Sequence, residues 1–160
     1  MKLAVVGTGY VGLVTRVTLS EVGHHVTCID IDDAKLEKMR HGISPIYEPG
    51  LSELMSKNIE AGRLSFSSNH EEGFHEADVI YIAVGTPENE DGSANLTYVE
   101  NVATTIALTA KKDTIVVTKS TVPVGTNDRL RQIIDHTKLY HKIKKINSNL
   151  IFATSKKVNQ

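Results

Sequence analysis

The sequence predicts a single α/β domain in which helices cover both faces of a parallel, doubly wound sheet. Two features indicate this fold. Short, almost continuously apolar runs alternate with segments of helical periodicity, which is the pattern of strands buried on both faces. In addition, a glycine-rich turn joins the first apolar run to the first helical segment. The chain has 160 residues, which suits one domain, since domains usually contain about 100–200 residues.

The first half of the chain is expected to contain two strands and three helices. A strand is predicted at residues 2–7 (KLAVVG), and the helix behind it closes with VTLSEVG at residues 17–23. A second strand follows at residues 25–32 (HVTCIDID). Two helices come next, at residues 32–42 and 50–62. Each ends at a glycine, the residue that most readily adopts the backbone of a helix C-terminus.

The second half is expected to supply three more strands and one helix. The helical segment TYVENVATTIALTAK covers residues 97–111. Its Thr97 and Glu100 have the spacing of a capping box, in which hydroxyl and carboxylate accept from free amide groups at the helix start. The strands are short and rich in β-branched and aromatic residues. They are RLSFSS at 63–68, DVIYIAVG at 78–85 and TIVVTKS at 114–120.

Charge is distributed unevenly along the chain, although the formal net charge is only -1. All 19 acidic residues lie at or before Asp135, whereas six of the 18 basic residues follow it. We therefore predict a folded domain at residues 1–135 and a divergent basic tail at 136–160. The apolar run NLIFAT at 149–154 can supply one last strand of the sheet. The near-neutral total favours neither nucleic acid nor a membrane as a partner.

The single cysteine, Cys28, excludes an internal disulfide and suits a reducing cytoplasm. It lies in the middle of an apolar strand, where a thiol packs rather than reacts, so no catalytic residue is predicted. The chain has no CxxC or HExxH spacing, and no apolar run approaches the roughly 18 residues of a membrane span. We predict no metal site, no membrane segment and a cytoplasmic location.

The stretch GTGYVG at residues 7–12 is the first candidate binding site. It stands between a strand and a helix, where each glycine of G-x-G-x-x-G has a separate task. Gly7 permits a tight turn, Gly9 lets the backbone approach a diphosphate, and Gly12 lets the helix pack closely on the strand. Amide groups at the helix start then face the phosphates. Taken alone, the motif also fits a turn that merely joins a strand to a helix.

Asp30 closes the second strand, 18 residues after Gly12. A carboxylate at this place accepts from both hydroxyl groups of an adenosine ribose and repels the additional 2′-phosphate of NADP, so the spacing predicts NAD as the cofactor. Asp32 and Asp33 are alternative ribose ligands, but they stand before a helix and are expected to cap it. Lys35 either reaches the adenosine end or is a solvated lysine.

Two further loops follow strand ends, GTP at residues 85–87 and STVPVGT at 120–126. Ligands of open α/β sheets bind at the carboxyl ends of the strands, where the hydroxyl groups of Thr86 and Thr121 can meet a cofactor or a substrate. The same threonines also suit turns that cap helices. The residues alone leave both interpretations open.

Six stretches of the chain follow one another in this order: AVVGTGYVGL, HVTCIDID, GISPIYEPGL, ADVIYIAVGTP, DGSANLTYVE and TKSTVPVGT. Together they resemble the N-terminal domain of the UDP-glucose/GDP-mannose dehydrogenase family, whose members include UDP-glucose 6-dehydrogenase. The resemblance covers roughly residues 1–135. YEPGL and STVPVGT are particular to that family rather than to dinucleotide-binding domains at large.

The resemblance implies a Rossmann-type domain from an NAD-dependent enzyme. Enzymes of this kind oxidise UDP-glucose to UDP-glucuronate in two hydride transfers, with a cysteine that carries a thioester. Thr121 would then lie near the reacting centre as well as near the cofactor. Carried over by position, the implied cofactor contacts are Gly7, Gly9, Tyr10, Val11, Gly12, Asp30, Lys35, Thr86 and Thr121.

The chain also departs from the family pattern. Where the family continues into NPEFLREG and later into the cysteine segment GGSCFPKD, this chain ends with NSNLIFATSKKVNQ at residues 147–160. We therefore expect a truncated or frame-shifted NAD-binding part that is inactive alone and meets a UDP-sugar only if the second domain is supplied. The alternatives are a fragment of a GDP-mannose or UDP-N-acetylmannosamine dehydrogenase and a stand-alone nucleotide-binding module.

Overall fold

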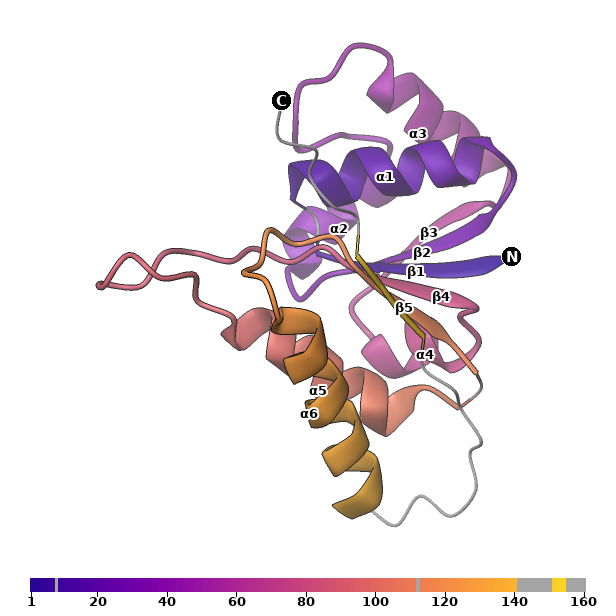
Figure 1. Ribbon diagram of the computed structural model, residues 1–160. Coiled ribbons are helices and arrows are strands. Elements are labelled where there is room, and N and C mark those ends of the chain that lie inside the picture. The colour runs from indigo at the N-terminus through magenta and orange to yellow at the C-terminus, as the bar shows by residue number, and fades with distance from the viewer. Residues whose placement is uncertain (8, 112, 141–150, 155–160) are drawn as a thin grey trace.

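The computed structural model describes residues 1–7, 9–111, 113–140 and 151–154, and these residues form one sheet of six parallel strands with helices on both faces (Figure 1). The strands are β1 (Lys2–Val6), β2 (His25–Ile29), β3 (Leu64–Ser67), β4 (Val79–Ile82), β5 (Ile115–Thr118) and β6 (Ile151–Thr154). Their order across the sheet is β3-β2-β1-β4-β5-β6. The predicted doubly wound parallel sheet is therefore confirmed.

β1 occupies the centre of the sheet because its side chains are apolar on both faces. Ala4 and Val5 point to opposite faces, and both are fully buried. Val5 is in register with Cys28 of β2 on one side and with Tyr81 of β4 on the other. A strand without a polar face reads as a continuous apolar run, which is why this element could be recognised in the sequence.

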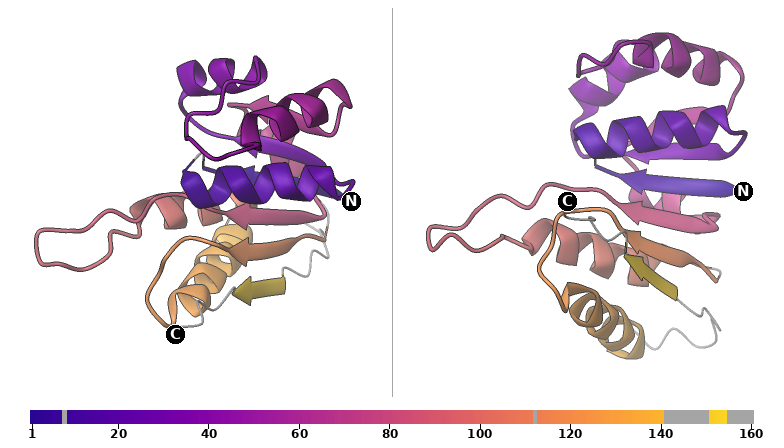
Figure 2. Two further views of the ribbon diagram at one scale, coloured as in Figure 1. Left: turned by 90° about the horizontal axis from the view of Figure 1, so that it is seen from above. Right: turned by 45° about the horizontal axis from the view of Figure 1, so that its top comes forward.

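The helices divide equally between the two faces, α1 to α3 on one and α4 to α6 on the other (Figures 1 and 2). No helix in the described part of the chain has the length and apolar character that a membrane span requires. The helices are α1 (Tyr10–Glu21), α2 (Asp33–Arg40), α3 (Leu51–Glu60), α4 (His70–His75), α5 (Thr97–Thr109) and α6 (Thr126–Tyr140).

Each face of the sheet has its own core. On the α1 side, Leu13, Leu36 and Met55 come from three different helices and are fully buried against the sheet. On the α5 side, Phe74 and Ile106 are buried in the same way. Burial of one such large apolar side chain stabilises a fold by about 1.5–3 kcal/mol. The sheet thus lies between two apolar cores, one against each helical layer.

The carboxyl ends of the strands all lie along one edge of the sheet because the strands are parallel. Gly7, Asp30, Ala83 and Lys119 directly follow β1, β2, β4 and β5. The segment at residues 83–96 leaves this edge as a long arm that projects from the molecule (Figures 1 and 2). All of the loops that the sequence indicated as candidate binding loops therefore converge on one edge.

The helix starts show both correct and wrong predictions. Asp32 caps α2 as expected, since its Oδ1 accepts from the backbone N of Lys35 at 3.0 Å. Asp33, which was expected to share this role, is instead the first residue inside the helix. The capping box predicted at Thr97 and Glu100 is wrong, because Thr97 is already inside α5. Asn95 supplies the contact instead, with its Oδ1 accepting from the backbone N of Thr97 at 3.0 Å.

Two helices, α4 and α6, are absent from those expected in the second half of the chain. α4 is the shorter of the two. It is only six residues long, and one large side chain, Phe74, anchors it in the core. Its start does carry a signal: the Oδ1 of Asn69 accepts from the backbone N of Glu71 at 3.0 Å and of Glu72 at 3.3 Å. An asparagine followed by two glutamates in the first turn is a helix start that sequence reasoning could have used.

The boundary predicted between the folded domain and the tail, at residue 135, lies within a helix. α6 continues through this position to Tyr140. The change from acidic to basic composition does not interrupt the helix, because lysine favours a helix about as much as glutamate does. Ile151 is in register with Ile115 of β5, so a strand lies within the apolar run for which a last strand was expected.

Cys28 is a core residue of β2. Its side chain is fully buried, in the core on the α1 side of the sheet. Burial raises the pKa of the Cys28 thiol above its ordinary value. The thiol is therefore protonated at neutral pH, and the prediction that Cys28 packs in the core is confirmed.

Folded protein is expected to react with a thiol reagent such as DTNB at least about a hundredfold more slowly than the same protein in urea, because Cys28 must first be exposed by opening of a core strand. The absorbance of released thionitrobenzoate measures both rates. The urea-unfolded chain is the control. Equal rates in native buffer and in urea would contradict the assignment of Cys28 to the core.

α1 packs very closely on the turn that precedes it. Gly12 is buried, and a Cβ atom there would lie 2.6 Å from the carbonyl oxygen of Gly7 and 3.3 Å from the Cβ of Ala83. A backbone carbonyl group cannot move aside as the end of a flexible side chain can. Gly12 is therefore the residue that allows helix and turn to approach.

Replacing Gly12 by alanine is expected to lower the free energy of unfolding by about 1–3 kcal/mol, because the added methyl group overpacks a contact with backbone. Urea denaturation followed by circular dichroism measures the change. Gly9→Ala is the matched control, since a Cβ at Gly9 meets nothing within 4 Å and its φ of -65° suits alanine. Equal unfolding free energies for the two variants would refute the close-packing role of Gly12.

Candidate functional site

The turn after β1 is held by the ends of two other strands. The backbone N of Gly7 donates to the carbonyl of Ile29 in β2 at 2.8 Å, and the N of Ala83 donates to the carbonyl of Val6 at 2.9 Å. Gly7 has a φ of 97°, a conformation that favours glycine. A Cβ there would also lie 2.6 Å from the carbonyl oxygen of Ala83. No other residue fits at this point of the turn.

Gly9 precedes α1 and faces open space. Its φ of -65° and ψ of 170° are ordinary extended values, so the backbone conformation at this position does not require a glycine. In the described residues, no side chain caps α1 and no acidic residue stands in its first turn. The amide groups of the helix start, with the positive end of the helix dipole, therefore suit an anion. Tyr10 and Val11 open the helix, and their side chains lie outside the described part of the structure.

Arg16 supports this turn from the interior, a role that sequence reasoning missed. Its side chain is fully buried. The Nε donates to the carbonyl of Gly12 at 3.0 Å, and an Nη donates to the carbonyl of Gly7. The other Nη has no hydrogen-bond partner among the described residues. A guanidinium group therefore joins two glycines of the motif by their backbone.

A cavity of about 590 Å³ runs along the carboxyl edge beside this turn. Its size falls in the range of about 300–1,000 Å³ that is usual for ligand sites. The turn, the end of β2, the end of β4 and one face of α5 form its walls. Among the residues that line it are Gly7, Gly9, Asp30, Lys35, Ala83 and Gly85.

The three aspartates after β2 have separate positions. Asp30 lines the cavity, and its Oδ1 accepts from the backbone N of Asp32 at 3.0 Å, which orients the carboxylate. Asp32 caps α2, and Asp33 is exposed in the first turn of that helix. Lys35 lines the same cavity as Asp30. The structure therefore brings the predicted pair Asp30 and Lys35 together with the glycine turn.

Thr86 and Thr121 are brought together by a direct contact between their loops. The Oγ1 of Thr86 donates to the backbone carbonyl of Thr121 at 2.9 Å. A second link joins the same loops, from the Oγ of Ser120 to the carbonyl of Val84 at 2.7 Å. The cavity reaches Gly85 but not the two threonines. They lie just beyond its lining, on loops that follow β4 and β5.

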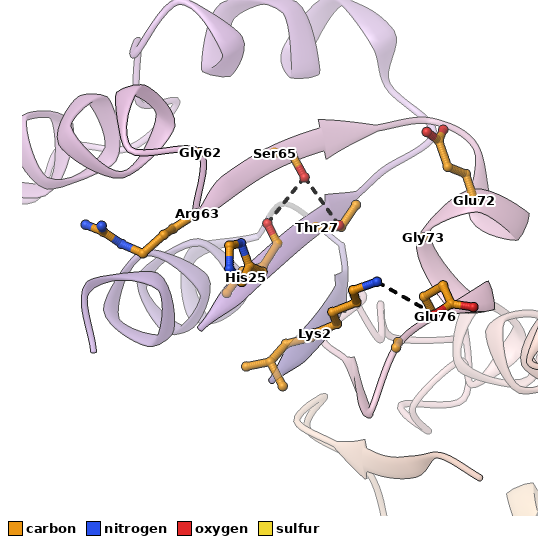
Figure 3. Close-up of a pocket in the computed structure, with 12 residues that line it drawn as sticks. Lys2, His25, Thr27, Gly62, Arg63, Ser65, Glu72, Gly73 and Glu76 are labelled. Atoms are coloured by element: carbon orange, nitrogen blue, oxygen red, sulfur yellow. Dashed lines mark hydrogen bonds and ion pairs between the residues drawn. The ribbon is translucent and has the colours of Figure 1, made fainter. Parts of the chain in front are cut away.

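A second hollow, of about 300 Å³, lies at the opposite end of the strands (Figure 3). Its polar side chains contact one another: the Oγ of Ser65 donates to the Oγ1 of Thr27 at 3.2 Å, and Lys2 and Glu76 form an ion pair of 3.7 Å. Open α/β sheets bind their ligands at the carboxyl ends of the strands. The cavity beside Gly9 and Asp30 is therefore the candidate site.

The residues of this cavity fit a dinucleotide. The open space above Gly9 admits a diphosphate at the uncapped start of α1, since nothing lies within 4 Å of the position of a Cβ atom. Asp30 offers a carboxylate at the distance along the chain that suits a ribose. Both residues line one continuous cavity.

Comparison with known proteins agrees with this geometry. Residues 1–153 match the UDP-glucose/GDP-mannose dehydrogenase family, NAD binding domain. A UDP-glucose 6-dehydrogenase of Bacillus subtilis is 61% identical over 134 residues, and one of Pseudomonas aeruginosa is 46% identical over 134 residues. These alignments cover 84% of this chain but 30% of each relative. The chain thus spans less than a third of the length of these relatives.

Two solved structures of nucleotide-sugar dehydrogenases are also similar to this chain. A UDP-glucose dehydrogenase of Pyrobaculum islandicum matches with a TM-score of 0.82 and 36% identity, over 95% of this chain and 34% of its own. A GDP-mannose dehydrogenase of Pseudomonas aeruginosa matches with a TM-score of 0.85 and 33% identity, over 96% of this chain and 35% of its own.

These findings confirm the resemblance inferred from the six sequence stretches and the cofactor that it implied, since NAD is the ligand by which the matched domain is described. The match covers the glycine turn, Asp30 and the loops that carry Thr86 and Thr121. This chain belongs to the UDP-glucose/GDP-mannose dehydrogenase family and corresponds to its NAD binding domain.

Proposed function

We propose that this chain binds NAD in the cavity at the carboxyl edge of the sheet and supplies the NAD-binding part of a UDP-glucose 6-dehydrogenase. One observation carries the proposal: Gly9, at an uncapped helix start, and Asp30, at the end of the neighbouring strand, line the same cavity. An anion site and a ribose site in one cavity are what a dinucleotide requires.

Each predicted contact has a proposed part in holding NAD. The diphosphate lies against the backbone at Gly9 and the first turn of α1, which begins with Tyr10 and Val11, while Gly7 and Gly12 shape the turn. Asp30 accepts from the hydroxyl groups of the adenosine ribose, and Lys35 stands at the same end of the cavity. Thr86 and Thr121 lie on the far side, where their linked loops border the nicotinamide end.

The proposed substrate of the complete enzyme is UDP-glucose. The curated relatives at 61% and 46% identity are UDP-glucose 6-dehydrogenases, and dehydrogenation of UDP-glucose is what those names describe. GDP-mannose remains an alternative, since the structure at 33% identity is a GDP-mannose dehydrogenase. A structure of a UDP-N-acetylmannosamine dehydrogenase from Staphylococcus aureus, at 29% identity, gives a second alternative.

The part of the reaction that falls to this chain is to bind and orient NAD. The thiol of Cys28 is buried in a strand and protonated, so we assign it no covalent step. We propose that the chain works in the cytoplasm, where thiols stay reduced. The division into a domain at residues 1–135 and a tail at 136–160 also remains a proposal.

Asp30→Ala is expected to remove most of the preference for NAD over NADP. The carboxylate repels a 2′-phosphate and accepts from the ribose hydroxyls that NAD presents, so its loss weakens NAD and relieves the repulsion of NADP. We expect the ratio of the two dissociation constants to change by about tenfold or more, since one charge-assisted hydrogen bond contributes about 1.5–3 kcal/mol. Isothermal titration calorimetry with both nucleotides measures the ratio.

Asp33→Ala is the control for this variant, and Gly9→Val tests the diphosphate end of the site. Asp33→Ala removes an exposed carboxylate three residues away and is expected to keep the wild-type ratio. Gly9→Val keeps an extended backbone that valine adopts readily, but its side chain fills the space of the diphosphate, so NAD binding is expected to be lost with the fold intact. NADP binding as tightly as NAD to the wild-type chain, or unchanged NAD affinity in Gly9→Val, would contradict the proposal.

A further inference from the structure

One wall of the NAD cavity consists of residues to which the proposed function assigns no role. Tyr98, Asn101, Val102 and Thr105 of α5 line it, and His70 at the start of α4 stands beside them. Positions 98, 101, 102 and 105 are three or four residues apart, so they share one face of the helix. α5 thus presents a continuous surface to the ligand.

Two large side chains of this part of the cavity are exposed. Ile31 directly follows Asp30 and is 79% exposed, and Tyr98 is 52% exposed. The ring of His70 is held edge-on against the buried Phe74, with ring centres 5.8 Å apart. Apolar and aromatic surfaces that line a cavity are covered best by a flat, aromatic group. This end of the cavity suits a base rather than a phosphate or a sugar.

Asn101 brings hydrogen-bonding capacity to the same wall. The hydroxyl of Thr105 already donates to the backbone carbonyl of Asn101 at 2.9 Å, so its proton is used within the helix. Among the residues that the structure describes, the carboxamide of Asn101 has no hydrogen-bond partner. A carboxamide offers an acceptor and a donor side by side. That pair matches the N6 amino group and the N7 atom of adenine.

We propose that Asn101 selects the base of the bound dinucleotide by pairing with the N6 and N7 atoms of adenine. The inference rests on the proposed function, because a ribose at Asp30 places the base against Ile31, next to α5. Hypoxanthine presents two acceptors at the same edge, O6 and N7, so the acceptor of the carboxamide loses its partner. Asn101 is then a specificity-determining residue of the cofactor site.

The test is calorimetric titration with NAD and with nicotinamide hypoxanthine dinucleotide. The wild-type chain is expected to bind NAD about tenfold more tightly than the hypoxanthine analogue. Asn101→Leu is expected to bind NAD about tenfold more weakly than wild type and to bind both nucleotides equally. Asn101→Asp, which keeps the size of the side chain but cannot donate to N7, is also expected to lose NAD affinity. Thr104→Val is the control on the same helix, outside the cavity lining, and keeps wild-type affinities.

The outcomes separate this inference from the proposed function. Equal binding of the two nucleotides to the wild-type chain overturns the role of Asn101 and leaves NAD binding in place. A preference for NAD that survives in Asn101→Leu also overturns it. Wild-type protein that binds neither nucleotide contradicts the proposed function and this inference together. Matching circular dichroism spectra of all variants tie the measured differences to the site rather than to folding.

Discussion

The site depends on one close approach of backbone, at Gly7, where the ends of β1, β2 and β4 meet. The N of Gly7 bonds to the end of β2, and the residue that would collide with any side chain at this position is Ala83, directly after β4. The left-handed backbone of Gly7 turns the chain out of the sheet and into α1. The start of α1, the carboxylate of Asp30 and the arm after β4 take their positions from this turn.

Electrostatics and packing act in the same direction around that turn. Arg16 carries a fully buried positive charge, and no carboxylate among the described residues is paired with it; carbonyl groups of Gly7 and Gly12 receive its hydrogen bonds instead. A buried charge is costly unless it is well hydrogen-bonded. Here it is placed beneath an uncapped helix start that is itself positive. Both features favour an anion above the turn, which links the packing of α1 to the proposed position of the diphosphate.

Most of the fold could be predicted from the sequence because most of its strands are apolar runs and its first three helices are followed by glycines, Gly23, Gly42 and Gly62. The failures are local in origin. The capping box at Thr97 was wrong because Asn95 competes for the same amide group from two residues earlier. α4 was missed because six residues are too few to establish a helical period. None of these errors concerns a strand, because the strands are the apolar runs that the sequence shows.

By itself, the sequence determined the parts of the site that lie within one strand, turn and helix: the glycines at 7, 9 and 12, and Asp30 at the end of the next strand. These residues are close together in the sequence, so a sequence motif records their spacing. Only the tertiary structure decided that Thr86 bonds to the loop of Thr121, that Arg16 lies beneath the turn, and that Asn101 on α5 shares a cavity with Asp30. These groupings join segments far apart in the chain. They depend on strand order and helix packing, which the spacing of residues within one short segment does not determine.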